Sequence, residues 1–247
     1  CGEKLVEILQ EYHVDTVFGI PGNHTVELYR GLAGSSIRHV SPRHEQGAGF
    51  MADGYARASG RPGVCFLISG PGLTNAMTPM MQALADSIPM LVISAVAARH
   101  QLGMGEGHLH ELPNQSALVS QCSRFSHTLM RPDELPRVLA RAFAVFSSER
   151  PGPVHIEIPL DIITADASHV LPQRWPPCFP ASANAEAIAA AKELLQTASN
   201  PCLVIGGGAV AAAAEVCAIA EQLNAPVVNT VNAKGLMPVS HPLAVGG

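Results

Sequence analysis

The stretch RHEQGAGFMADGYAR, residues 43–57, places one carboxylate, Glu45, at the start of a predicted helix. The helix continues through glycines and alanines, which leave a surface that another backbone or a flat ring can approach closely. Residues 37–40, which begin with Ile37 and end with Val40, predict a strand just before it, so Glu45 stands where a strand gives way to a helix. Open α/β folds bind ligands at this edge of the sheet. A glutamate in a first helical turn can also be present only because the helix dipole favours it there.

The segments on either side of this stretch alternate between two patterns. Short apolar runs predict strands at residues 16–20, 64–68, 89–96, 125–129 and 154–158. Helical spacing of apolar residues predicts helices at 2–12, 24–32, 73–86, 114–122 and 133–148. Continuously apolar strands that alternate with helices predict an α/β fold with a doubly wound, mostly parallel sheet flanked by helices.

The composition changes after residue 167. Residues 168–184 hold four prolines, which remove backbone donors and restrict their neighbours, so we expect a linker there. A second Rossmann-like α/β unit is predicted from 185 to 247, with helices at 185–197 and 209–223 and strands at 201–205 and 226–230. Roughly 60 residues is short for a doubly wound domain, so this unit is expected to be the truncated start of one.

The bulk composition excludes several classes of function. The chain has 247 residues, a formal net charge of −5 and only 4% aromatic residues, so it carries no basic or aromatic surface for nucleic acid. Its six cysteines show no C-x-x-C spacing, which argues against a zinc or redox motif. The sequence has no apolar run of membrane length and no charged-then-apolar leader, and a cytoplasmic protein is expected.

Two further loops are rich in glycine and proline. GIPG at residues 19–22 and SGPG at 69–72 each follow a predicted strand. Loops at the carboxyl ends of parallel strands can line one crevice, where glycine allows close backbone approach. Ordinary turn chemistry is the competing explanation. Neither loop matches the phosphate-binding pattern of P-loop ATPases.

Four ordered motifs resemble the pyrimidine-binding domain of thiamine-diphosphate enzymes of the acetolactate synthase-like family. They are VFGIPG at 17–22, the block at 44–57, SGPGLTN at 69–75 and RPGPVHIEIP at 150–159. The resemblance covers residues 2–165. From about residue 185 the chain is similar to the start of the family's central domain, with the match carried by residues 201–208 and 231–238.

The resemblance implies that Glu45 is catalytic. In that family this glutamate hydrogen-bonds to the aminopyrimidine ring nitrogen of the coenzyme and stabilises the imino tautomer, which then removes the C2 proton. The same resemblance implies that the coenzyme ring is bound by the residues of the three loops, namely Ile20, Pro21, Gly22, Glu45, Pro71 and Asn75.

The chain departs from the carboligating members of the family at one loop. Those members usually carry a glutamine before a glutamate, whereas this chain has His110 before Glu111 in a glycine-rich segment. His24 follows the first glycine- and proline-rich turn directly after Asn23, a position where many relatives have small residues. We interpret Asn23, His24, His110 and Glu111 as candidate substrate contacts, although a solvent loop with incidental histidines is the competing explanation.

The resemblance also implies partners and cofactors. It implies thiamine diphosphate, with Mg²⁺ held by a G-D-G segment and a later asparagine that this sequence lacks, so no metal ligand is assigned here. Some members bind FAD in the central domain, but nothing in this sequence supports it. The family shares each active site between two subunits, which implies a homodimer or homotetramer and an inactive isolated 1–247 segment.

Several functions remain open. The favoured hypothesis is an enzyme that decarboxylates or carboligates small 2-oxo acids. The segment PGNHTVELYR, residues 21–30, also resembles a subgroup that decarboxylates 5-guanidino-2-oxopentanoate, whose cation would favour nearby carboxylates such as Glu106 and Glu111. A Rossmann-type oxidoreductase is weakly suggested by Gly206, Gly208 and Ala211, but the next strand lacks the expected acid. A non-catalytic binding module would have no chemical need for Glu45.

Overall fold

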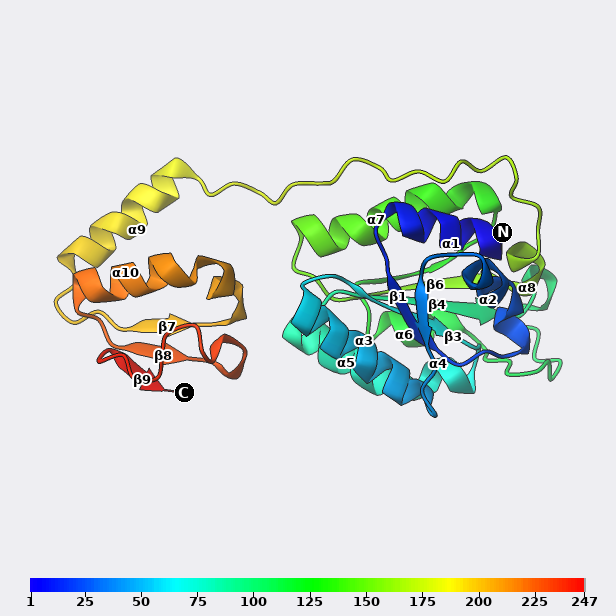
Figure 1. Cartoon of the computed structure of the whole chain (residues 1–247), viewed down its shortest axis with the longest axis horizontal. Coiled ribbons are helices and arrows are strands. Elements are labelled where there is room, and N and C mark those ends of the chain that lie inside the picture. Colours follow the sequence, from blue (N-terminus) through cyan, green and yellow to red (C-terminus); the bar gives the residue numbers. More distant parts are fainter. Residues whose placement is uncertain (247) are drawn as a thin grey trace. The chain divides into compact units, whose positions relative to one another are not determined.

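The structure is a computed structural model that describes residues 1–246. It divides into two compact units, Cys1–Pro180 and Ala181–Gly247, which are described separately. Figure 1 shows the first unit as a sheet covered by helices on both faces. Within residues 1–246, no helix is both long and apolar enough to cross a membrane.

The first unit is built on a six-stranded sheet in which every neighbouring pair is parallel. The strand order is β2-β1-β3-β4-β6-β5. Its strands are β1 Thr16–Gly19, β2 Arg38–Val40, β3 Gly63–Leu67, β4 Met90–Val96, β5 Phe125–Thr128 and β6 Pro153–Pro159. Its helices are α1 Gly2–Glu11, α2 Val26–Ala33, α3 Glu45–Ser59, α4 Pro71–Asn75, α5 Met77–Asp86, α6 Gln115–Ser120, α7 Leu135–Ser148 and α8 Leu160–Ile163, with short 3₁₀ turns η1 Asn23–Thr25, η2 Arg99–Gln101 and η3 Pro132–Glu134.

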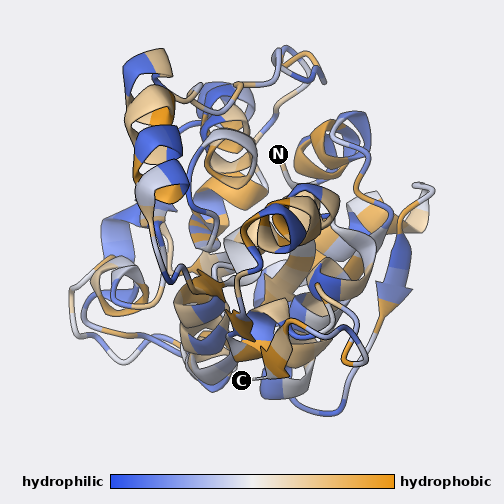
Figure 2. Ribbon diagram, turned by 90° about the vertical axis from the view of Figure 1, so that its left-hand side faces the viewer, coloured by the Kyte–Doolittle hydropathy of each residue, from blue (hydrophilic) through white to orange (hydrophobic). Residues whose placement is uncertain are grey.

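Successive side chains of the central strands point to opposite faces of the sheet, so they pack in two separate hydrophobic cores. In β3, Val64 and Phe66 pack with helices α1, α2, α7 and α8. Cys65 and Leu67 pack on the opposite face with α3, α4, α5 and α6. Both faces of the sheet are therefore buried at its centre, which is why β3 and β4 are almost wholly apolar, whereas the edge strands β2 and β5 are only partly buried and carry polar residues. In Figure 2 the strands are mostly hydrophobic, whereas the helices carry both hydrophilic and hydrophobic stretches.

The α/β class and the parallel sheet predicted from the sequence are confirmed. The structure differs from the prediction in detail. Residues 73–86 form two helices, α4 and α5, separated at Ala76, because Pro71 starts a short first helix that ends there. The helix α8 after β6 was not predicted, since four residues are too few to show a helical period.

The second unit contains a three-stranded parallel sheet in the order β7-β8-β9. Its elements are α9 Ala185–Thr197, β7 Leu203–Ile205, η4 Gly207–Ala212, α10 Ala213–Leu223, β8 Val227–Asn229, η5 Val231–Ala233 and β9 Ala244–Gly246. The strand β9 was not predicted. The glycine-rich segment after β7 forms the 3₁₀ turn η4 rather than the start of a regular helix, and β8 ends at Asn229 without an acidic residue.

Candidate active site

The fold places a topological switch point between two neighbouring strands, β1 and β3. The chain leaves β1 toward α2, whose Leu28 packs in the first core, and leaves β3 toward α4, whose Leu73 packs in the second. The two connections therefore diverge to opposite faces of the sheet at the carboxyl ends of adjacent strands. Such a switch point is where doubly wound folds bind ligands. The predicted GIPG and SGPG loops lie at this point.

Glu45 is the first residue of α3 and is half-buried. His44 caps the helix, since its Nδ1 accepts a hydrogen bond from Gln46 N at 3.1 Å. The side chain of Asn75, at the end of α4, donates to Glu45 Oε2 at 2.9 Å. Among the described residues no donor reaches Oε1. The carboxylate is therefore fixed through one oxygen and free to bind a ligand through the other.

Two glycines of the predicted loops, Gly22 and Gly72, lie so close to Ile68 that a side chain would not fit at either position. Ile68 directly follows β3. A Cβ on Gly22 would lie 2.7 Å from Ile68 Cδ1, and one on Gly72 would lie 2.3 Å from Ile68 Cγ2. The same added Cβ on Gly72 would lie 3.5 Å from Glu45 Oε1. The wall beside the carboxylate thus consists of an isoleucine and bare backbone, which suits the face of a flat ring.

Two histidines lie beside this wall. His24 Nδ1 and Ser69 Oγ are 2.6 Å apart, which joins the loop after β1 to the loop after β3. The rings of His24 and His110 meet edge to face with centroids 5.8 Å apart. Burial, and then the neighbouring His110, hold the pKa of His24 below its ordinary value, so the ring is neutral at neutral pH. His110 Nδ1 is buried and has no hydrogen-bond partner among the described residues.

Glu111 organises its own loop. Its two carboxylate oxygens accept backbone hydrogen bonds from Gly105, Gly107 and His108, at 2.7, 2.8 and 3.0 Å. These bonds lower the pKa of the Glu111 carboxyl. Glu106 is more exposed and lies 3.2 Å from His108 Nε2. Of the two carboxylates in this loop, Glu106 therefore makes fewer hydrogen bonds than Glu111.

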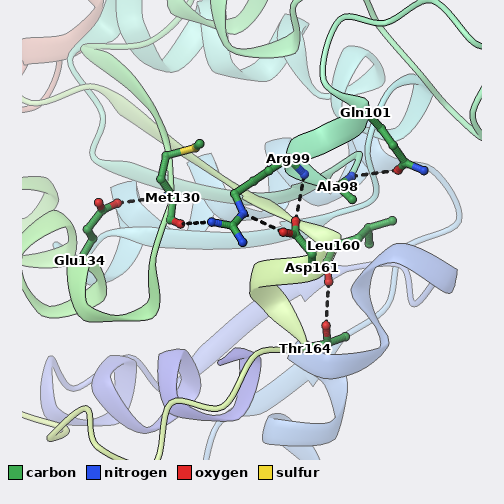
Figure 3. A network of polar contacts seen from close by, with 8 residues as sticks. All are labelled: Ala98, Arg99, Gln101, Met130, Glu134, Leu160, Asp161 and Thr164. Atoms are coloured by element: carbon green, nitrogen blue, oxygen red, sulfur yellow. Dashed lines mark hydrogen bonds and ion pairs between the residues drawn. The ribbon is translucent and has the colours of Figure 1, made fainter.

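A network of polar contacts holds the start of the loop 99–113, which carries His108 and His110 and is called the histidine loop below (Figure 3). Arg99, just after β4, donates from N and Nε to the carboxylate of Asp161 at 2.9 and 2.7 Å. Its guanidinium also donates to Met130 O at 3.3 Å. Asp161 follows β6 and Met130 follows β5, so one arginine joins the ends of three adjacent strands. The loop that carries His110 begins from this fixed point.

The remaining predicted site residues share this edge of the sheet. Ile20, Pro21 and Asn23 lie in or just after the turn that follows β1, and Pro71 begins α4. None of them hydrogen-bonds to Glu45 among the described residues. The structure thus brings together Glu45 with Asn75, and His24 with His110, around the loops that hold Gly22, Gly70 and Gly72.

Sequence reasoning missed three residues of the site. Ile68 fills the wall, Ser69 binds His24, and Gln115 accepts a hydrogen bond from Gly70 N at 2.8 Å. Ser69 stood inside a motif that had been singled out, so its position was visible but not its partner. Gln115 is 3% exposed, and nothing in the sequence distinguishes a buried glutamine from a surface one.

No group of three or more histidine, cysteine, aspartate or glutamate side chains is arranged to hold a metal ion in residues 1–246. The chemistry that these residues offer is therefore a carboxylate, an amide and two imidazoles beside an apolar wall.

The sequence matches two models of one family. Residues 1–118 match the N-terminal TPP binding domain of thiamine pyrophosphate enzymes, and residues 188–247 match the central domain.

Known proteins of this kind are similar along the whole chain. The probable 2-ketoarginine decarboxylase AruI of Pseudomonas aeruginosa is 53% identical over 253 residues, which cover 100% of this chain and 44% of that protein. The acetolactate synthase large subunit of Corynebacterium glutamicum is 38% identical, over 99% of this chain and 40% of that protein. The large subunit of acetolactate synthase isozyme 1 of Escherichia coli is 36% identical, over 99% and 43%.

The chain spans less than half the length of each of these curated relatives. The two family models together match most of the chain, in the order in which the N-terminal and central domains follow one another. The chain therefore belongs to the thiamine pyrophosphate enzymes, in the acetolactate synthase-like family.

Proposed function

We propose that the whole protein is a thiamine-diphosphate-dependent 2-oxo acid decarboxylase in which Glu45 activates the coenzyme. The observation that carries this proposal is the Glu45 carboxylate, held by Asn75 at 2.9 Å through Oε2 and open at Oε1, at the switch point of a parallel sheet. The role of Glu45 in activating the coenzyme is inferred from the resemblance between this chain and the coenzyme-binding domain of the family.

The residues present fit the aminopyrimidine half of the coenzyme. Glu45 Oε1 would hold a proton toward a ring nitrogen, while Asn75 keeps the other oxygen in place. Gly22 and Gly72 lack the side chains that would crowd Ile68 at the apolar wall. We place Ile20, Pro21 and Pro71 beside the same ring. When bound, thiamine diphosphate supplies a carbanion nucleophile and then an electron sink.

The diphosphate and its Mg²⁺ need hard oxygen ligands, and this chain offers no suitable cluster among its described residues. We propose that a further domain supplies those ligands, from a second subunit that faces α3. The exposed apolar side chains of Phe50, Met51 and Met81 on α3 and α5 support such a contact. A homodimer or homotetramer would complete the site. The six free thiols are compatible with a reducing compartment, and we propose the cytoplasm.

Decarboxylation requires a proton at the former carbonyl carbon after the bond to the carboxylate breaks and CO₂ leaves. His24 and His110 lie beside the wall as a neutral imidazole and a partly unpartnered one. We propose that they contact the substrate and that one of them relays this proton from water, accepting a proton at one ring nitrogen as it donates from the other. Asn23, exposed at the start of η1, would lie at the rim.

We propose 5-guanidino-2-oxopentanoate as the substrate, because the 53% identical relative is named a probable 2-ketoarginine decarboxylase. Glu106 is exposed in the loop that also carries His110, and its one hydrogen-bond partner among the described residues is His108, so we propose that it can meet a guanidinium. Glu111 already binds three backbone N–H groups of the same loop. Acetolactate synthesis is the second candidate, supported by the relatives at 36–38% identity.

The test is a panel of 2-oxo acids with the whole protein, thiamine diphosphate and Mg²⁺. We expect CO₂ and an aldehyde one carbon shorter from the guanidino acid, and little turnover of pyruvate. Acetolactate from pyruvate would favour the second candidate. No coenzyme-dependent turnover of any 2-oxo acid would contradict the proposal.

A further inference from the structure

A buried polar cluster lies beneath the candidate site and is not used by the chemistry proposed above. Its centre is Gln115, the first residue of α6. The side-chain oxygen accepts from Gly70 N at 2.8 Å. The side-chain nitrogen lies 2.9 Å from Ala95 O, 3.0 Å from Glu157 Oε2 and 3.2 Å from Ser94 Oγ. One side chain thus connects the loop after β3 to strands β4 and β6.

Gly70 determines the shape of the SGPG loop, residues 69–72. Its φ of 59° and ψ of −115° fall in a region that only glycine adopts readily. A Cβ there would lie 2.4 Å from His110 O, so the histidine loop packs directly on it. Gly70 also caps α4. Ser69, on one side of it, contacts His24, and Asn75, at the end of α4, contacts Glu45.

The opposite end of Gln115 meets a buried carboxyl. Glu157 is 3% exposed, and burial raises its pKa. Its other oxygen accepts from Thr128 at 2.6 Å. A glutamine serves here because it has an acceptor for Gly70 and a donor for Glu157 in one side chain. An apolar residue would leave both groups buried without that partner, which is costly.

We propose that Gln115 is a positioning residue for Glu45: it holds the Gly70 turn, and the turn sets Asn75 and α4 against the carboxylate. This proposal rests on the function proposed above. The cluster is rigid because Ser94 also contacts His155, and His155 contacts Ser126, at 2.8 and 2.7 Å.

The test compares Gln115→Met with Thr128→Val in the whole protein. Methionine keeps the size of glutamine but removes both of its polar contacts. Valine removes the other partner of Glu157 and leaves Gly70 untouched. Hydrogen exchange of the segment 68–76 reports the turn, and thiamine-diphosphate affinity and kcat report its effect on the site.

For Gln115→Met we expect faster exchange in residues 68–76 and kcat lower by about 30-fold with a smaller change in KM, since a misplacement of about 1 Å can cost 10²-fold in rate. Thr128→Val should leave both at the level of the unchanged protein. Gln115→Glu keeps an acceptor for Gly70 and should recover part of the protection. It also serves as the test variant if Gln115→Met does not fold.

The outcomes separate the two proposals. Unchanged exchange at 68–76 in the Gln115 variants would overturn the anchoring role, whatever the enzyme does. Faster exchange with unchanged kcat and coenzyme affinity would overturn the positioning role while the proposed function stands. Faster exchange in a protein that has no thiamine-diphosphate activity would leave the anchor intact and refute the link to Glu45.

Discussion

Glu45 takes its proposed role from its neighbours. A glutamate that is present only for the helix dipole needs no particular partner. Glu45 instead receives a hydrogen bond from Asn75, 30 residues further along the chain, and has the backbone of Gly72 beside its second oxygen. This pairing of two predicted site residues on different helices favours a built site over a helix-capping glutamate.

At the same scale, His155 should make the stability of the protein sensitive to acid. It is fully buried between Ser94 and Ser126, and burial lowers its pKa to about 3 from an ordinary 6.5. The unfolded chain therefore binds a proton that the folded chain refuses, and stability falls as the pH drops below 6.5. Between pH 7.5 and 5.5 we expect this residue to cost roughly 1.4 kcal/mol.

Urea unfolding of His155→Gln at the two pH values measures this term. The variant should lose this contribution of roughly 1.4 kcal/mol to the pH dependence, whereas His100→Gln, at an exposed histidine, should keep it. Glu157 has a raised pKa and so contributes with the opposite sign, but it is present in all three proteins. An unchanged pH dependence in His155→Gln would show that the imidazole is not held neutral.

Only some residues of the candidate site could be predicted from the sequence. Glu45 and Asn75 stand inside motifs with a known chemical role, so their positions carried the prediction. Gln115 and Ser69 act through contacts with residues about 45 positions away in the sequence. Such contacts depend on which strands become neighbours, and local pattern does not contain that information.

At the scale of the elements, the predicted helices and strands follow from apolar periodicity because both faces of the sheet are covered. The periodicity was sufficient where an element spans several turns, as in α1 and α7. It failed for α8 and β9, which have four and three residues. Short elements are set by what they pack against.

The contact between α3 and β3 depends on the absence of a side chain at Gly63. A Cβ there would lie 2.2 Å from Ala52 O and 2.6 Å from Ala52 C, so it would meet the backbone of α3. We expect Gly63→Ala to lower the free energy of unfolding by about 2 kcal/mol or more, because the helix that carries Glu45 must move.

Gly54→Ala is the matched control, at a glycine of α3, the helix against which Gly63 packs. A Cβ at Gly54 meets nothing within 4 Å, and alanine favours helix by roughly 1 kcal/mol over glycine. Chemical denaturation should therefore show opposite signs for the two variants. Equal stabilities of Gly63→Ala and the unchanged protein would mean that α3 is not packed as closely on β3 as described.

At the scale of the whole molecule, the chain presents one wall of a site. The described residues hold a carboxylate, an apolar wall and two histidines at the switch point between β1 and β3, but no cluster that could hold a metal. The relatives are more than twice as long, so the activity belongs to the whole protein. The four motifs that carry the resemblance belong to one half of the family's coenzyme site.

The central claim is that Glu45 activates thiamine diphosphate, and proton–deuterium exchange at C2 of the coenzyme bound to the whole protein tests it most directly. We expect rapid exchange in the unchanged protein and a loss of at least about 100-fold in Glu45→Gln, since proton transfer by a positioned group contributes that much. Coenzyme affinity measured alongside ensures that the site is filled. Exchange at the unchanged rate in coenzyme-saturated Glu45→Gln would contradict the account.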